Sequence, residues 1–246
     1  MFVHDLILIC FFTECTAVNI KKLEIPALVE VGKDSVVLDC DYDLGTATKD
    51  SGLVVKWFIN ENNLVYQWIP PLQPQVVGLL KDKIDRSFKV SEEPLKAFRA
   101  LRILRPTTDI TGNYTCVVST FLEEDRQTKS MLVYSTGRNL HFVQEKKYVF
   151  LVTLICAAED LYPKPVLSIL SQGKPLPQSS THVTMDSWGL YSVTTTAVLH
   201  DDDVEGQFEE FVCDLRLPPA NYSDTRSTIY YPGIWAQNGL QKPHKR

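Results

Sequence analysis

The chain has few of the residues that enzyme and metal sites need. Its 246 residues include 5 histidines, and no two of them stand close enough to suggest a metal motif. With 11 glycines and no Gly-rich phosphate loop, the sequence does not indicate a nucleotide site. The G-x-S-x-G, H-E-x-x-H and paired-cysteine zinc motifs are also missing. We therefore expect no catalytic residue, no metal site and no cofactor.

The chain also lacks a positive net charge and has few long apolar runs. The formal net charge is −5, whereas nucleic acids and anionic membranes favour basic surfaces, so neither is expected as a partner. Beyond the N-terminal region no segment reaches the roughly 18 apolar residues that span a bilayer. The end of the chain is polar and basic, and we expect residues 233–246 to form a disordered tail. The sequence thus predicts no direct membrane span.

Residues 1–17 predict a secretory signal peptide. A short apolar run, residues 6–12 (LILICFF), precedes a small-residue cleavage site after Ala17. The alternative is a hydrophobic strand at the start of the fold. Cleavage would remove Cys10 and Cys15 and leave four cysteines, an even number that suits an oxidising compartment. We therefore expect a secreted, extracellular protein.

The four remaining cysteines, read with their neighbours, predict the fold. Cys40 and Cys116 enclose Trp57, and Tyr114 stands two positions before Cys116. This pattern is typical of an immunoglobulin sandwich, in which a disulfide joins two sheets beside a buried indole. Short alternating runs separated by turn residues agree with it. Residues 18–135 are predicted to form a variable-type domain with Cys40 and Cys116 disulfide-bonded.

A second cysteine pair, Cys156 and Cys213, predicts a second sandwich over residues 147–232, after a linker over residues 136–146. Residues 161–163 (LYP) and 189–192 (GLYS) resemble a constant-type immunoglobulin domain. Ile169 takes the place of the core tryptophan, and Phe211 that of the corner tyrosine. The chain is predicted to be all-β, with two tandem immunoglobulin-like β-sandwiches, variable-type then constant-type.

Three surface features have candidate roles. Asn113 and Asn221 begin N-glycosylation sequons, which a secreted chain can use. The acidic run at residues 201–205 (DDDVE) has the oxygens of a calcium site, but such a run is more often a solvated turn. We expect the solvated turn.

Alternation around Trp57 predicts an exposed face on the first domain. The neighbours of Trp57 point away from the core, and strand 64–69 presents either its two aromatic residues or the residues of opposite phase. Exposed apolar patches with aromatic side chains are typical of protein interfaces. The alternative is that the second domain or segment 70–84 covers this sheet. The predicted partner-binding face consists of Lys56, Phe58, Tyr66, Trp68 and Val117.

Four segments resemble a known family. They are residues 40–44 (CDYDL), 55–58 (VKWF), 65–70 (VYQWIP) and 111–116 (TGNYTC). Together they resemble the first immunoglobulin domain of the beaten-path family of arthropod neuronal cell-surface and secreted proteins. The resemblance covers residues 20–135 and is looser beyond them.

The resemblance implies a recognition role in cell adhesion or axon guidance. The implied partner is an extracellular immunoglobulin-family protein of the sidestep type, engaged through the first domain at outward residues such as Phe58, Tyr66 and Trp68. A soluble humoral immune protein that binds non-self ligands through its loops is the alternative function. A secreted enzyme or enzyme inhibitor on a sandwich scaffold is the third.

Overall fold

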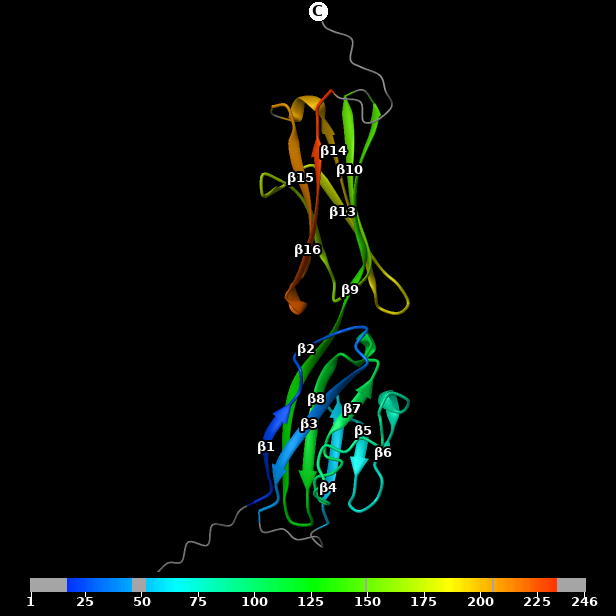
Figure 1. Ribbon diagram of the computed structural model, residues 1–246, viewed down its shortest axis with the longest axis vertical. Coiled ribbons are helices and arrows are strands. Elements are labelled where there is room, and N and C mark those ends of the chain that lie inside the picture. Colours follow the sequence, from blue (N-terminus) through cyan, green and yellow to red (C-terminus); the bar gives the residue numbers. More distant parts are fainter. Residues whose placement is uncertain (1–16, 46–51, 149, 205, 234–246) are drawn as a thin grey trace, which may run out of the picture. The chain divides into compact units, whose positions relative to one another are not determined.

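The computed structural model describes residues 17–45, 52–148, 150–204 and 206–233 (Figure 1). Residues 1–16 of the predicted signal peptide and residues 234–246 of the predicted tail lie outside this part of the chain. The chain forms two compact units that divide between Met131 and Leu132, with the short segments 28–32 and 107–109 grouped with the second. No helix in the described ranges is long and apolar enough to cross a membrane.

The first unit is a sandwich of two sheets. One sheet has the order β1-β3-β7, and the other has the order β9-β8-β4-β5-β6. The short β2, which lies in the segment grouped with the second unit, pairs in parallel with residues 132–134 of β9. Two short 3-10 turns, η1 (Gly78–Leu80) and η2 (Thr108–Ile110), lie between the strands. The strands are β1 (Asn19–Glu24), β2 (Leu28–Glu30), β3 (Ser35–Asp43), β4 (Val54–Ile59), β5 (Asn63–Trp68), β6 (Gln75–Val76), β7 (Leu101–Leu104), β8 (Gly112–Ser119) and β9 (Glu124–Tyr148).

The core of this sandwich forms around the predicted disulfide. Cys40 on β3 and Cys116 on β8 are bonded, with their Cα atoms 6.4 Å apart. Trp57 on β4 is the register partner of Cys116 and is fully buried. Since partners in an antiparallel ladder share a face, the indole packs on the same side of the sheet as the disulfide. The predicted variable-type core is confirmed.

Core side chains also hold the irregular segment before β7. Trp57 Nε1 donates to the carbonyl of Arg99 at 3.1 Å, and the Tyr66 hydroxyl donates to the carbonyl of Phe98 at 2.7 Å. The guanidinium of Arg99 pairs with Asp39 at 2.9 Å and also with Asp41. Side-chain hydrogen bonds thus replace the ladder that a regular strand would supply in this segment.

The predicted tyrosine corner is present. The buried Tyr114 hydroxyl donates to the carbonyl of Ile110 at 2.8 Å. Gly112, two residues before it, does not have a positive φ, so a left-handed turn is not the reason for a glycine there. A Cβ atom there would collide with the side chain of Asn60, whose Oδ1 accepts the N–H of Asn113. Close approach of Asn60 accounts for the glycine.

Tyr114→Phe is expected to lower the free energy of unfolding of the first domain by about 1–2 kcal/mol, because the buried carbonyl of Ile110 loses its hydroxyl donor. Urea denaturation of the full chain measures the change. Tyr148→Phe is the matched control, since Tyr148 is 69% exposed. Equal losses in the two variants would contradict the role of the corner hydroxyl.

The second unit is also a two-sheet sandwich. One sheet has the order β13-β14-β10-β9 and the other β12-β11-β15-β16, the arrangement of a constant-type domain. The 3-10 turns are η3 (Asp201–Asp203) and η4 (Pro218–Ala220). The further strands are β10 (Leu151–Tyr162), β11 (Val166–Ser171), β12 (Lys174–Pro175), β13 (Ser179–Met185), β14 (Tyr191–His200), β15 (Glu209–Leu217) and β16 (Tyr222–Tyr230).

The second core repeats the first with different residues. Cys156 and Cys213 are disulfide-bonded, with their Cα atoms 6.0 Å apart. Ile169 is the register partner of Cys213, as Trp57 is of Cys116, and it is fully buried. Phe211, at the corner position, is 1% exposed. Apolar side chains therefore fill both expected positions, and the prediction of two tandem sandwiches is confirmed.

Residues 136–146 lie within β9 and pair with β10, for example Val143 with Ile155 and Gln144 with Leu154. They belong to the sheet of the second unit and do not form the linker predicted from the sequence. The reason is that their backbone groups pair with those of β10. The hydropathy of the segment does not predict this pairing.

The acidic run after β14 holds an ion pair. The carboxylate of Asp201 accepts Lys146 Nζ at 3.1 Å, the Tyr230 hydroxyl, and the N–H of Gly233 at 2.7 Å. Burial raises the pKa of Asp201, but the hydrogen bonds from Tyr230, Lys146 and Gly233 outweigh it, so that its pKa lies below the usual 3.8. No group of three or more His, Cys, Asp or Glu side chains in the described ranges could hold a metal.

Candidate protein-binding face

On the outer face of the first-domain sheet, register partners on β4, β8 and β9 form rows of neighbouring side chains across the strands. Lys56 on β4 pairs with Val117 on β8, which pairs with Arg126 on β9. Lys56 is half-buried and Arg126 is exposed, whereas Val117 between them is only 5% exposed. Lys56 and Val117, both predicted for the partner-binding face, therefore lie on the same outer face. Val117 lies between two long cationic side chains and is itself largely buried.

A second row contains the aromatic residue of β4. Phe58 pairs with Thr115, and Thr115 pairs with Thr128 on β9. The two threonine hydroxyls are 2.7 Å apart, so both side chains point to the same side of the sheet. Leu64 on β5 pairs with Phe58 from the other flank. Phe58 is half-buried and lies on the outer face, as its alternation with Trp57 predicts.

The prediction that Tyr66 and Trp68 point outward is wrong. Each is 2% exposed. Tyr66 is the register partner of Trp57 and Trp68 that of Val55, so both point into the core. The Trp68 ring lies edge-on to Phe98 with centroids 5.7 Å apart. Both side chains therefore belong to the core of the sandwich and not to its outer face.

A β-bulge in β5 changes which of its side chains point inward, and alternation along the sequence does not predict it. The register between β4 and β5 shifts between Trp57 and Phe58, which leaves Val65 without a partner. Val65 and Tyr66 are consecutive and both are buried, so simple alternation fails here. The outward residues of the segment are Leu64 and Gln67, both half-buried, and Ile69, which is 36% exposed.

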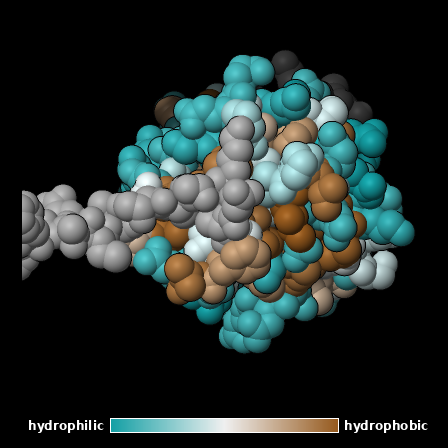
Figure 2. Space-filling view, turned by 90° about the horizontal axis from the view of Figure 1, so that it is seen from below, coloured by the Kyte–Doolittle hydropathy of each residue, from teal (hydrophilic) through white to brown (hydrophobic). Residues whose placement is uncertain are grey.

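The turn between β8 and β9 presents two apolar side chains that the sequence interpretation missed. Phe121 is 80% exposed and Leu122 is 93% exposed. The N–H of Thr120 donates to the carbonyl of Glu123 at 2.8 Å and closes the turn. Figure 2 looks onto the end of the first unit where β8 turns into β9, and hydrophobic surface is exposed there. The sequence does contain this information, because two apolar residues in the turn of a hairpin cannot be buried in the core between the sheets.

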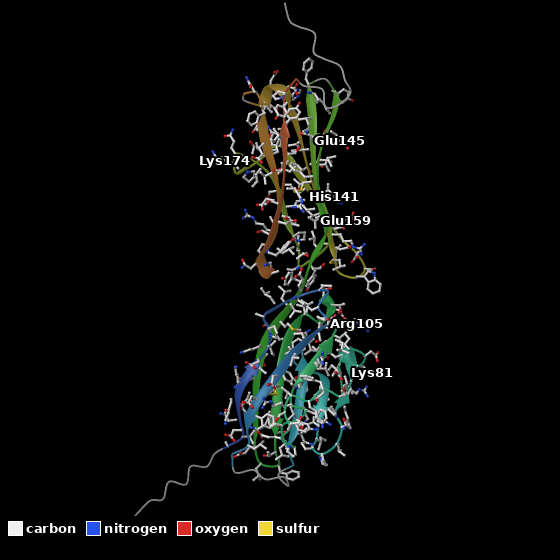
Figure 3. The ribbon with its side chains drawn as sticks, in the orientation of Figure 1. Lys81, Arg105, His141, Glu145, Glu159 and Lys174 are labelled. Atoms are coloured by element: carbon white, nitrogen blue, oxygen red, sulfur yellow. A yellow bond between two sulfur atoms is a disulfide. The ribbon has the colours of Figure 1, made fainter. Side chains whose placement is uncertain are left out.

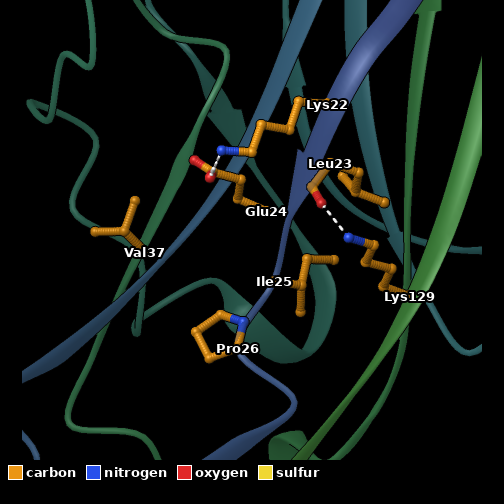
Figure 4. Close-up of a pocket in the computed structure, with 7 residues that line it drawn as sticks. All are labelled: Lys22, Leu23, Glu24, Ile25, Pro26, Val37 and Lys129. Atoms are coloured by element: carbon orange, nitrogen blue, oxygen red, sulfur yellow. Dashed lines mark hydrogen bonds and ion pairs between the residues drawn. The ribbon is translucent and has the colours of Figure 1, made fainter.

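A cavity beside β1 in the described part of the first unit is lined by charged side chains that are already paired. Its volume is about 370 Å³ (Figure 4). Lys22 at its wall is paired with Glu24, and Lys129 Nζ donates to the carbonyl of Leu23 at 2.6 Å. The charged groups around it are thus engaged with the protein itself.

Outside the Lys146–Asp201 pair, three titratable side chains of the second unit lie apart from one another. His141 and Glu145 on β9 and Glu159 on β10 lie at different heights along their strands (Figure 3). All three are exposed. They do not converge into a catalytic arrangement.

Both predicted glycosylation residues are exposed. Asn113 Oδ1 accepts the Ser130 hydroxyl at 2.6 Å on β8–β9. Asn221 is the C-cap residue that follows η4, with a φ of 51°. Glycosylation at Asn113 and Asn221 stays a prediction.

Comparison with known proteins identifies the fold. No protein-family model and no curated protein match the chain. Among solved structures, bovine butyrophilin superposes with a TM-score of 0.66 and 18% identity, over 83% of this chain and 94% of that one. The chain has the fold of tandem immunoglobulin domains.

Two further immunoglobulin-fold structures agree. A chain from the complex of ICOS with ICOS-L and an anti-ICOS-L VNAR domain superposes with a TM-score of 0.61 and 15% identity, over 82% of this chain and 97% of that one. The extracellular portion of mouse CD200RLa gives 0.57 and 16%, over 81% and 95%. At such identities the likeness concerns the fold.

Proposed function

We propose that this is an extracellular recognition protein that binds another immunoglobulin-family surface protein through its first domain. The observation that carries the proposal is the apolar turn of Phe121 and Leu122, exposed by 80% and 93%, at the end of the two strands that bear Val117 and Arg126. In agreement with the beaten-path resemblance, the proposed setting is cell adhesion or axon guidance, with a sidestep-type partner.

The chemistry of this surface suits a protein partner. Strands β8 and β9 connect the turn to a sheet face on which the half-buried Phe58 and the nearly buried Val117 lie near Lys56 and Arg126. Protein interfaces combine an apolar centre with a polar rim in this way. A small ligand needs an enclosed pocket with convergent polar groups instead. The exposed surface thus supports docking of a second folded domain.

The solved structures of similar fold support the kind of partner. One of them comes from a complex of ICOS with ICOS-L, a pair of binding proteins. The predicted signal peptide, the two disulfides and the exposed sequons at Asn113 and Asn221 support an extracellular site of action.

Leu122→Asp is expected to weaken partner binding by at least tenfold, because a central apolar contact at an interface is replaced by a charge that must be desolvated. The secreted full chain is screened against extracellular immunoglobulin proteins, sidestep-type proteins included, and affinities are measured by surface plasmon resonance. Trp188→Asp is the matched control, since Trp188 is an 82% exposed turn residue of the second unit.

Phe58→Asp extends the test to the sheet face. Loss of binding in both first-domain variants with retention in Trp188→Asp supports the proposal. Binding by Leu122→Asp and Phe58→Asp at the unaltered affinity would exclude this surface. Binding to microbial surface ligands alone would favour the humoral immune function.

A further inference from the structure

The first described residues of the chain contact the hairpin between β8 and β9. The backbone N–H of Val18 donates to Glu123 Oε2 at 2.8 Å, across 105 positions of sequence. Two residues later the N–H of Ile20 donates to Asp125 Oδ2 at 2.7 Å. The side chains of Val18 and Ile20 are buried, with 5% and 2% exposed. From Val18 onward the chain is thus held to the hairpin.

Val18 is also the residue that follows the predicted cleavage site. Hydrolysis of the Ala17–Val18 peptide bond by a signal peptidase takes up one water, leaves a carboxylate on Ala17 and leaves an ammonium on Val18. We propose that the mature chain begins at Val18 and that its freed α-ammonium forms an ion pair with Glu123, which joins the N-terminus to the β8–β9 hairpin.

The contact suits an ammonium better than an amide. Before cleavage the Val18 nitrogen is a neutral donor with one hydrogen. After cleavage it has a full positive charge and three hydrogens, and charge-assisted hydrogen bonds are about twice as strong as neutral ones. An ammonium next to a buried side chain needs a counter-charge, which Glu123 supplies. A cut one residue later would remove the buried Val18 side chain and its contact with Glu123.

Acidic side chains outnumber basic ones around Val18. A cavity of about 530 Å³ lies beside this residue. Lys21, the basic side chain among the described residues that line it, is already paired with Asp43 at 2.8 Å. Glu124 and Asp125 add two more carboxylates, so the local field favours a positive charge. The residues around the cavity are Ala17, Val18, Asn19, Lys21, Asp43, Glu124 and Asp125.

The ion pair makes stability depend on pH in a defined direction. A nearby carboxylate raises the pKa of an α-amino group above its usual value of about 7.7–8.0. The charged groups around Val18 are Glu123, which accepts its N–H, and Glu124, Asp125 and the Lys21–Asp43 pair, which line the same cavity. Because the folded-state pKa is raised, the stabilisation is complete below about pH 7.7 and is lost as the pH rises through the folded value.

The first experiment locates the N-terminus. The full chain is secreted from eukaryotic cells, its glycans are removed, and its intact mass is measured. The expected mass is that of a chain starting at Val18. Any other N-terminal residue, or an uncleaved chain, overturns the proposal.

The second experiment tests the ion pair. Glu123→Gln is made in the mature chain and in a chain that keeps Thr16 and Ala17, where Val18 remains an amide. We expect the melting temperature of the first domain to fall by roughly 3–6 °C in the mature form and by less than half of that in the extended form. Glu124→Gln is the matched control, and we expect it to change the melting temperature by the same amount in the mature and the extended forms.

Equal losses from Glu123→Gln in the mature and extended chains would overturn the ion pair. The mature wild-type chain is also expected to lose stability between pH 8 and pH 10, and Glu123→Gln to remove that loss. A pH profile that is the same with and without Glu123 would contradict the proposal too. Partner binding enters neither experiment, so these results are independent of the proposed function.

Discussion

Trp57→Ala is expected to lower the free energy of unfolding of the first domain by about 4 kcal/mol, in the range of large-to-small changes at buried aromatic residues. The indole is fully buried beside the Cys40–Cys116 disulfide. Its removal leaves a cavity between the sheets. It also leaves the carbonyl of Arg99 without the Nε1 donor that lies at 3.1 Å, so the irregular segment before β7 loses an anchor.

Urea denaturation of the full chain, followed by near-ultraviolet circular dichroism, measures this loss. Phe58→Ala is the matched control, because Phe58 is the next residue of β4 and lies half-buried on the outer face. We expect it to cost less than about 1.5 kcal/mol, since a half-buried ring leaves no enclosed cavity. If Phe58→Ala destabilised the domain as much as Trp57→Ala, the assignment of the two faces would be wrong.

Lys146→Met is expected to lower the free energy of unfolding of the second domain by about 3 kcal/mol. The side chains of Lys146 and Asp201 are each 10% exposed and their charged atoms are 3.1 Å apart. Removing one partner of such a pair leaves a desolvated charge, which costs about 3–5 kcal/mol. The hydrogen bonds from Tyr230 and Gly233 to Asp201 remain, so we place the expected loss at the lower end.

The pH dependence of this loss identifies its cause. The pKa of folded Asp201 is lowered, so its contribution is present above the unfolded pKa of about 4 and is lost as the pH falls through the folded value. The destabilisation by Lys146→Met is therefore expected to shrink at low pH. Asp202→Asn, at an exposed position of the same run, should have a small effect at every pH. A loss independent of pH would mean that Lys146 acts by packing alone.

The sequence by itself determined the two cores. Cysteine spacing, the position of Trp57 and the replacements at Ile169 and Phe211 all predicted residues that the structure places inside. These features are local or covalent. A strand side chain alternates with its own neighbours, and a disulfide requires both cysteines to face the same interior.

Tertiary structure alone decided what depends on pairing between distant segments. The bulge at Val65 turned Tyr66 inward, because the register is set by contacts with β4 and not by alternation along β5. Residues 136–146 became strand because β10 offered partners for their backbone groups. The contacts of Lys146 with Asp201 and of Val18 with Glu123 cross 55 and 105 positions. Contacts of this kind form only when the sheets are assembled, so no local pattern of residues predicts them.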